Sequence, residues 1–85
     1  MTDDEIIQLI DTSLSEEFEL DRTLMVPDAH IVDDLGLDSL DMVDMVVVLE
    51  KAFRFKIREE EAIREIRTLG DIHQFVLGKK REMGL

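Results

Sequence analysis

The sequence predicts an all-α fold: a small four-helix bundle with a long loop between the first two helices and a short third helix. Two observations predict it. Apolar residues recur at three- and four-residue intervals in several segments, which is the pattern of helices with one buried face. Residues that cap helix N-termini precede those segments. The 85 residues are enough for one small core, so we expect residues 1–85 to form a single domain whose last few residues are frayed.

The first helix is predicted to run from about Asp3 to Glu17. Thr2 can cap its N-terminus, and Glu5 can complete a capping box with it. The acidic residues of the first turn suit the positive end of the helix dipole. The residues expected on the buried face lie at three- and four-residue steps: Ile6, Ile7, Ile10, Leu14 and Phe18.

The segment from Glu19 to Leu37 is expected to be a long loop, because the helical periodicity is lost there and the only proline, Pro27, lies in it. Apolar residues scattered along the loop suggest that it is held against the core and includes a short helical turn. They are Leu20, Leu24, Val26, Ile31 and Leu35. Gly36 precedes the next helix, and we interpret it as a position of tight approach to that helix.

The second helix is predicted from Ser39 to about Phe53, and it is the clearest helix of the chain. Asp38 is a favourable N-cap, and Asp41 occupies the third helical position. Three consecutive valines, at positions 46–48, make a strand the rival interpretation. The length of the segment and its capping residues favour the helix.

The rest of the chain is predicted to hold two further helices. Phe55–Arg58 is expected to be a connector and Glu59–Glu65 a short third helix. Thr68 can cap the fourth helix, with Asp71 at its third position. The apolar sides of the two helices are expected to be Ala62, Ile63 and Ile66 for the third and Leu69, Ile72, Phe75 and Val76 for the fourth. Three cations suit the negative C-terminal end of the last helix: Lys79, Lys80 and Arg81.

The net charge of −11 comes from 21 acidic residues against 10 basic ones. This balance argues against a nucleic-acid-binding protein, which must neutralise phosphates, and against docking on an anionic membrane. We expect a monomer that is steered toward basic partners. Residues 1–50 carry fifteen acids and one base, a net charge of −14, whereas residues 51–85 carry six acids and nine bases, a net charge of +3. The sign of the charge therefore changes within the second helix.

Compartment and catalysis are also constrained. No apolar run approaches the length of a membrane span, and the acidic start is unlike a secretory signal, so the expected compartment is cytoplasmic. The chain has no cysteine, which excludes disulfides, thiolate nucleophiles and cysteine-ligated zinc. No serine-hydrolase elbow occurs, the acidic residues lack calcium-loop spacing, and both histidines, His30 and His73, are expected at the surface. We therefore expect neither an enzyme nor a metal site.

The second helix carries two apolar stripes rather than one. The first stripe consists of Met42, Met45, Val46, Leu49 and Phe53. The second stripe consists of Leu40, Val43 and Val47 and is interleaved with Asp41, Asp44 and Glu50. It is either a binding surface for a basic partner helix or part of a central helix that is buried on most sides. The pattern alone leaves both interpretations open.

Ser39 is the first residue of the second helix. A phosphate on its hydroxyl would lie beside the free backbone N–H groups of the first turn, where the helix dipole favours an anion. Taken alone, the residue is interpreted as an ordinary surface serine, and it is the surrounding sequence that changes this interpretation.

Residues 33–41 read Asp-Asp-Leu-Gly-Leu-Asp-Ser-Leu-Asp and resemble the acyl carrier protein signature D-L-G-x-D-S-L-D. The resemblance covers almost the whole chain, and its further matching residues are Leu49, Glu50, Phe53, Ile57, Glu59, Glu60, Glu61 and Thr68. It implies a single carrier domain in which Ser39 receives 4′-phosphopantetheine from coenzyme A through a phosphopantetheinyl transferase. It also implies that the thiol of this arm holds acyl groups as thioesters for enzymes of fatty-acid, polyketide or related biosynthesis.

The resemblance implies roles for other residues as well. Asp38 is similar to the family's aspartate that helps the transferase engage the carrier. Acyl-loading and acyl-processing enzymes with basic docking patches would contact Leu40, Asp41, Val43, Asp44, Val47 and Glu50. The core, or an apolar cavity for the acyl chain, would be lined by Met42, Met45, Val46, Leu49, Phe53, Ile57, Ala62, Ile63, Leu69 and Ile72. Methionine suits such a cavity because it repacks readily.

The sequence departs from the family pattern in three places. Typical members carry a further acidic cluster after the residue matched by Glu50. In this sequence the corresponding residues are basic: Lys51, Arg54, Lys56 and Arg58. Arg58 also stands where a proline is common, and the stretch between the third and fourth helices is one residue longer. From the change of sign we hypothesise a specialised carrier with its own partner set. The competing hypothesis is an unmodified acidic helical adaptor that binds a basic partner through the second helix.

Overall fold

The computed structural model of the chain describes residues 2–54 and 66–83. Within them the chain forms α1 (Asp3–Phe18), the 3-10 helix η1 (Arg22–Leu24), α2 (Ser39–Phe53) and α4 (Leu69–Met83). These described residues contain no strand, and one isolated antiparallel bridge joins His30 to Thr68. The predicted all-α class is therefore confirmed.

Part of the predicted bundle lies outside the described residues. It comprises the connector Phe55–Arg58 and the third helix Glu59–Glu65, and with them the predicted core residues Ile57, Ala62 and Ile63. The end of the chain, where fraying was predicted, lies outside them too. Three α-helices of the predicted four are thus described.

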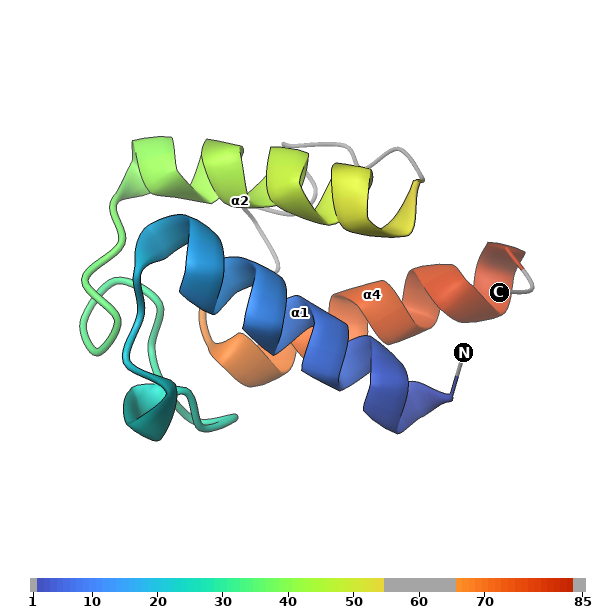
Figure 1. The fold of residues 1–85 in the computed structure, drawn as a ribbon, viewed down its shortest axis with the longest axis horizontal. Helices are drawn as coiled ribbons and strands as arrows, with labels where there is room; N and C mark the ends of the chain where they lie inside the picture. The colour runs from blue at the N-terminus through green and yellow to red at the C-terminus, as the bar shows by residue number, and fades with distance from the viewer. Residues whose placement is uncertain (1, 55–65, 84–85) are drawn as a thin grey trace.

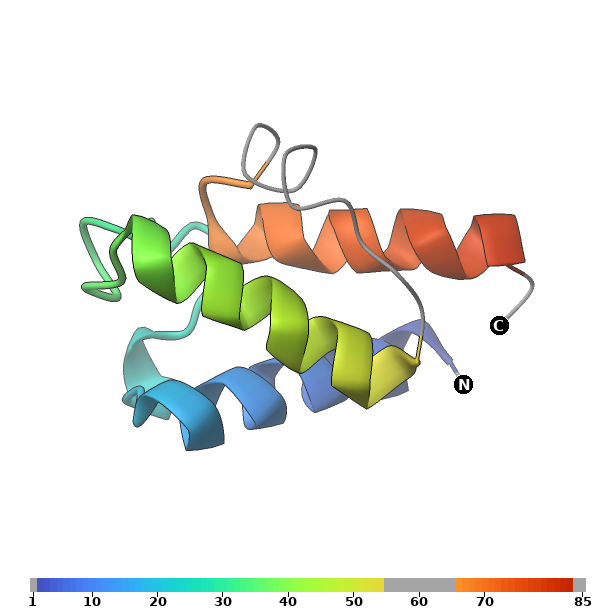
Figure 2. The same ribbon diagram turned by 90° about the horizontal axis from the view of Figure 1, so that it is seen from above.

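α1 packs against both α2 and α4, and the three helices surround one core (Figures 1 and 2). The long loop lies at the end of the molecule where α1 ends and where α2 and α4 begin (Figure 1). The start of α1 and the last turns of α4 lie at the opposite end, where Lys80 Nζ is 3.0 Å from Asp3 Oδ1. The loop therefore lies at one end of the bundle, and at the other end an ion pair joins α1 to α4.

The core is apolar and takes residues from all three helices and from the loop. Its members are Ile6, Ile10 and Leu14 of α1, Met42, Met45, Val46 and Leu49 of α2, Ile66, Leu69, Ile72, Val76 and Leu77 at and in α4, and Met25, Ile31 and Leu37 of the loop. Each such side chain contributes about 1.5–3 kcal/mol when it is fully buried. Phe18, Phe53 and Phe75 are half-buried and pack against this core.

The predicted N-terminal caps of α1 and α4 are present. The Glu5 N–H donates to Thr2 Oγ1 at 3.2 Å, and the Thr2 N–H donates to Glu5 Oε1 at 2.9 Å, which completes the capping box of α1. At the start of α4 the Asp71 N–H donates to Thr68 Oγ1 at 3.1 Å. Each cap of this kind stabilises a helix by about 1 kcal/mol.

Asp71 also accepts backbone bonds itself. The N–H groups of Arg67 and Thr68 donate to its carboxylate at 3.0 and 3.1 Å, and they hold the pKa of Asp71 below its ordinary value of 3.8. The contribution of this cap to stability is therefore full above the ordinary pKa and is lost as the pH falls through the lowered one.

α1 and α2 end in the same way. α1 extends one residue beyond the predicted end, and its C-cap, Glu19, adopts the left-handed conformation with φ 53° and donates its N–H to Ser15 O. α2 ends at Phe53 as predicted, and its C-cap, Arg54, has φ 57° and donates its N–H to Glu50 O at 2.7 Å. A left-handed C-cap satisfies carbonyl groups that the helix leaves free.

The loop contains the predicted helical turn, η1, and three of the five predicted apolar residues hold it against the core: Ile31 is buried in the core, and Leu20 and Leu35 pack against it. Leu24 and Val26 are 52% and 51% exposed, so they do not hold the loop. Met25 and Ala29, which the sequence pattern did not single out, are buried as well.

Backbone hydrogen bonds complete that attachment. The N–H of Leu69 donates to Ala29 O at 3.0 Å, and the N–H of Gly70 donates to Pro27 O at 2.8 Å. These bonds satisfy N–H groups in the first turn of α4 that have no intrahelical acceptor. The loop therefore serves as part of the cap of α4.

The tight approach predicted at Gly36 occurs at another glycine. Gly36 has φ +72°, and a Cβ there would meet no atom within 4 Å, so this glycine is required by its left-handed backbone and not by crowding. At Gly70 a Cβ would lie 2.9 Å from Pro27 O. Gly70 therefore permits the contact between the loop and α4.

The prediction that His73 lies at the surface is wrong. His73 is 6% exposed, and its Nε2 lies 2.7 Å from Oδ1 of Asp11, which is 8% exposed. Because the carboxylate accepts, Nε2 donates, and the pair joins α4 to α1 inside the core. A lone histidine on an apolar face gives no indication of a partner 62 residues away. His30 keeps 40% of its side chain exposed, in agreement with the prediction.

Candidate functional site

The start of α2 is held by a reciprocal pair of aspartates. The N–H of Asp41 donates to Asp38 Oδ1 at 2.9 Å, and the N–H of Asp38 donates to Asp41 Oδ2 at 3.1 Å. Both carboxylates are therefore fixed by backbone donors of the helix that they cap. Ser39, the first residue of α2, lies between them in sequence and is exposed.

The residues before the cap hold this turn against the protein. Gly36 turns the chain with its positive φ, and Leu37 is buried and donates its N–H to Ile31 O at 3.1 Å. Leu37 precedes the N-cap, and Met42, four residues after the cap, is also buried in the core. This is the arrangement of a hydrophobic staple, which fixes the angle at which the chain enters a helix.

Leu37 was absent from the predicted site, although a signal for it was present. An apolar residue directly before an N-cap, followed by another at the fourth helical position, is the sequence pattern of a hydrophobic staple. Recognition of that pattern would have identified Leu37 as the anchor of the turn that carries Ser39.

The geometry at Ser39 fits a phosphate ester. The N–H groups of Ser39 and of Leu40 belong to the first turn, where a helix provides no internal acceptor. An anion bonded to the exposed Oγ would meet these donors and the positive end of the helix dipole. Any longer group attached through that phosphate would extend from an exposed position.

α2 presents one buried and one exposed apolar face. Leu40 is 75% exposed and Val47 39% exposed, while Val43 is half-buried. The acidic residues interleaved with them are exposed at Asp44 and half-buried at Asp41 and Glu50. The interpretation that α2 is buried on most sides is therefore wrong for the described structure, and an apolar stripe with acidic neighbours lies at the surface.

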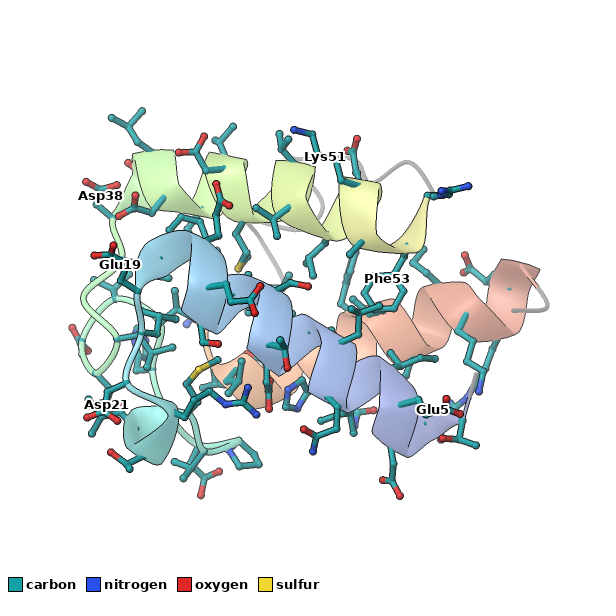
Figure 3. All side chains as sticks on the ribbon, in the orientation of Figure 1. Glu5, Glu19, Asp21, Asp38, Lys51 and Phe53 are labelled. Atoms are coloured by element: carbon teal, nitrogen blue, oxygen red, sulfur yellow. The ribbon has the colours of Figure 1, made fainter. Side chains whose placement is uncertain are left out.

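The charge along α2 reverses toward its end. Asp38 lies at the first turn, Lys51 lies near the last, and Phe53 turns inward toward the core (Figure 3). Lys51 and Arg54 are exposed. The remaining predicted cations, Lys56 and Arg58, lie outside the described residues. The exposed side of α2 thus carries negative charge around Ser39 and positive charge at its other end.

Comparison with known proteins identifies the family to which the chain belongs. Residues 8–76 match a protein family described as "Phosphopantetheine attachment site", and the matched segment includes the whole of α2. The chain is 38% identical over 74 residues to an acyl carrier protein of Syntrophobacter fumaroxidans, covering 87% of this chain and 89% of that protein. It is 36% identical over 72 residues to acyl carrier protein 2 of Ralstonia nicotianae, covering 85% and 88%.

A further relative is acyl carrier protein AcpXL of Brucella melitensis, with 43% identity over 53 residues that cover 62% of this chain and 57% of that protein. The chain therefore belongs to the acyl carrier protein family, in which a protein carries phosphopantetheine and works with acyl-processing enzymes. This confirms the carrier role and the phosphopantetheine cofactor that the signature around Ser39 implied. Among the described residues, no helix combines the length and the apolar character that crossing a bilayer requires.

Proposed function

We propose that Ser39 is the residue to which 4′-phosphopantetheine is attached, and that the chain catalyses no reaction of its own. The observation that carries this proposal is an exposed serine at the capped first position of α2, within the segment that matches the phosphopantetheine attachment family. When bound, the group supplies a terminal thiol that holds an acyl cargo as a thioester. Such a thiol explains how a chain without cysteine serves thioester chemistry.

Asp38 and the first turn of α2 position the attachment point. Asp38 caps the helix and remains exposed beside Ser39, where a phosphopantetheinyl transferase reaches both. The N–H groups of the first turn, together with the dipole of α2, stabilise the phosphate after transfer. The chain's own contribution is therefore an oriented hydroxyl and a site that favours an anion.

The exposed side of α2 is the proposed docking surface for partners. It consists of Leu40, Asp41, Val43, Asp44, Val47 and Glu50. Its apolar stripe provides contact area, and its carboxylates steer enzymes that have basic patches. These partners are the transferase and the acyl-loading and acyl-processing enzymes of fatty-acid, polyketide or related biosynthesis.

The cations at the end of α2 support a narrower partner set. Lys51 and Arg54 are exposed, and their positive charge would repel enzymes that bind the end of the helix through arginines. We infer a specialised carrier whose partners present acidic groups there. The exchange Lys51→Glu would then weaken loading by its own enzymes, and equal service to a housekeeping set of fatty-acid enzymes would contradict the inference.

The buried residues of α2 and α4 are the proposed shelter for an acyl chain. Met42 and Met45 lie in the core, and methionine adapts its shape to a guest more readily than a branched side chain. We further propose that residues 1–85 act as one monomeric carrier domain in the cytoplasm. The net charge of −11 supports the monomer, because like charge keeps copies apart.

The experiment is a modification assay read by intact mass. The protein is incubated with coenzyme A, magnesium and a broad-specificity phosphopantetheinyl transferase, and we expect a gain of one phosphopantetheine. Ser39→Ala abolishes the gain, whereas Ser13→Ala, a half-buried serine within α1, leaves it unchanged. Modification that persists in Ser39→Ala places the group elsewhere. An unmodified wild-type chain that still binds a basic partner favours the adaptor.

A further inference from the structure

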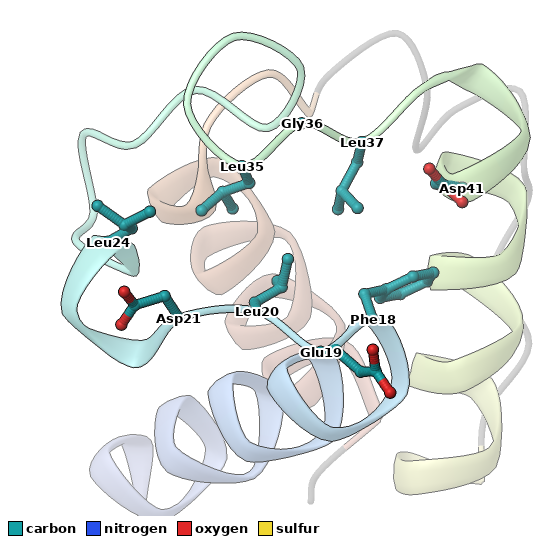
Figure 4. Close-up of a pocket in the computed structure, with 9 residues that line it drawn as sticks. All are labelled: Phe18, Glu19, Leu20, Asp21, Leu24, Leu35, Gly36, Leu37 and Asp41. Carbon is teal, nitrogen blue, oxygen red and sulfur yellow. The ribbon is translucent and has the colours of Figure 1, made fainter.

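A cleft of about 340 Å³ lies beside the first turn of α2, between the end of α1 and the loop. Its apolar lining consists of Phe18, Leu20, Leu24, Leu35 and Leu37. Figure 4 shows Leu20 directed from the end of α1 toward Leu35 and Leu37 of the loop. The volume lies within the range of ordinary small-molecule sites.

The walls of this cleft are held in place. Leu37 is buried and anchored to Ile31 by its backbone, and Leu35 donates its N–H to His30 O at 3.1 Å. On the other side, Leu20 donates its N–H to Ser15 O at 3.0 Å, which continues the cap of α1. A cleft with fixed walls needs less ordering when it takes up a guest.

Carboxylates lie around this apolar lining. Glu19, Asp21 and Asp41 are among the nine lining residues, and none of the nine is a lysine, arginine or histidine. Asp21 accepts from the Thr23 hydroxyl and N–H at 2.7 and 2.9 Å, and these bonds lower its pKa. The cleft therefore combines an apolar floor with a negative rim.

Ser39 lies two residues from Leu37 and two from Asp41, so the cleft and the proposed attachment point share one turn of the chain. A group tethered there meets the cleft at an effective concentration on the order of millimolar, whereas a free molecule or a partner side chain does not. This step rests on the proposed function of Ser39.

We propose that this cleft binds the end of a short acyl cargo that bears an ammonium group, such as an aminoacyl thioester. The alkyl part of the cargo lies on the leucines, and its ammonium is attracted by the negative rim that Glu19, Asp21 and Asp41 form around them. A cargo that ends in a carboxylate is repelled by the same rim, and a neutral cargo gains only the apolar contact.

The first test uses free probes and needs no attached arm. Hexylammonium, hexanol and hexanoate are titrated separately into the protein while the methyl resonances of its leucines are followed by NMR. We expect hexylammonium to shift the signals of Leu20, Leu24, Leu35 and Leu37 at the lowest concentration, and hexanoate to shift them least.

Two variants separate the rim from the floor. The C-cap of α1 uses only the backbone of Glu19, and its carboxylate is exposed. Glu19→Gln is therefore expected to keep the cap and to weaken hexylammonium binding about two- to fivefold. Glu17→Gln is the matched control, because Glu17 is exposed on α1 and does not line the cleft. Leu24→Asn changes a half-exposed part of the floor and is expected to weaken all three probes alike.

The second test attaches the cargo. A transferase loads the chain from coenzyme A thioesters that end in 6-aminohexanoyl, hexanoyl or 5-carboxypentanoyl groups, releasing adenosine 3′,5′-bisphosphate, and intact mass establishes the loading before spectra are recorded. We expect leucine shifts in the cleft for the amine-ended group, reduced by Glu19→Gln. A chain that fails to load contradicts the function of Ser39, while the free-probe result stands on its own.

Three outcomes overturn the proposal. Equal binding of hexylammonium and hexanol removes the role of the rim, and shifts confined to the outer face of α2 place the site elsewhere. Probe binding without any response to the tethered amine assigns the cleft to a ligand other than the cargo, such as a lysine of a docking enzyme.

Discussion

α2 differs from the pair formed by α1 and α4 in the kind of side chain that it leaves exposed: of these three helices, only α2 exposes large apolar residues among the described ones. The contact between α1 and α4 encloses even a charged group, since Asp11 and His73 bond to each other inside the core. α2 buries one face and leaves Leu40 and Val47 in solvent. Stability and partner recognition therefore depend on different surfaces. A buried residue cannot contact a partner, and an exposed residue contributes little to the free energy of folding.

The largest effect is expected from breaking the buried pair. Asp11→Ala leaves the His73 ring buried without its partner, which should lower the free energy of unfolding by about 3 kcal/mol. Urea unfolding measures this change. Glu16→Ala, an exposed acid of the same helix outside its first turn, is the control and should stay within about 0.5 kcal/mol of the wild type.

The double exchange Asp11→Leu with His73→Leu tests the reason for that loss. It removes both polar groups from the core and should recover much of the stability. Wild-type stability of Asp11→Ala would show that this pair does not hold α1 to α4.

A smaller effect is expected where the loop meets α4. Gly70→Ala would place a Cβ 2.9 Å from Pro27 O, a backbone atom that cannot move alone, and should cost about 2 kcal/mol. Gly78→Ala is the matched exchange on the same helix, and no atom lies within 4 Å of its Cβ position. It should stabilise the protein by up to about 1 kcal/mol because alanine favours helices more than glycine does. Thermal unfolding compares the two, and changes of the same sign would contradict the close contact.

The smallest effect on stability, combined with a clear effect on function, is expected on the exposed face of α2. Leu40→Ala should change the free energy of unfolding by less than about 0.5 kcal/mol, because the side chain is already exposed. It should lower kcat/KM of the phosphopantetheinyl transferase by about tenfold, because an apolar anchor at the interface is lost.

Val26→Ala is the control for this exchange. Val26 is an exposed aliphatic residue on the loop, outside the proposed docking surface, and its exchange should leave the transferase rate unchanged. An equal loss of rate in both variants would move the docking surface away from α2.

Local interactions made much of this fold predictable. Each N-terminal cap joins residues three positions apart, as Asp38 and Asp41 do, so the helix starts can be read directly from short stretches of sequence. The apolar periodicity of α1, α2 and α4 likewise depends only on neighbouring turns. The signature around Ser39 is contiguous for the same reason, and it led to the carrier family that the comparisons show.

Interactions between distant segments were decided by the tertiary structure. His73 was predicted at the surface because nothing near it in the sequence indicates a buried partner. That partner, Asp11, lies 62 residues away. Gly36 and Gly70 look alike in the sequence, and only the packed loop shows that Gly70 is the crowded one. The cleft beside Ser39 likewise joins the end of α1 to the loop. Such contacts depend on how the helices pack, because no short stretch of residues contains both partners.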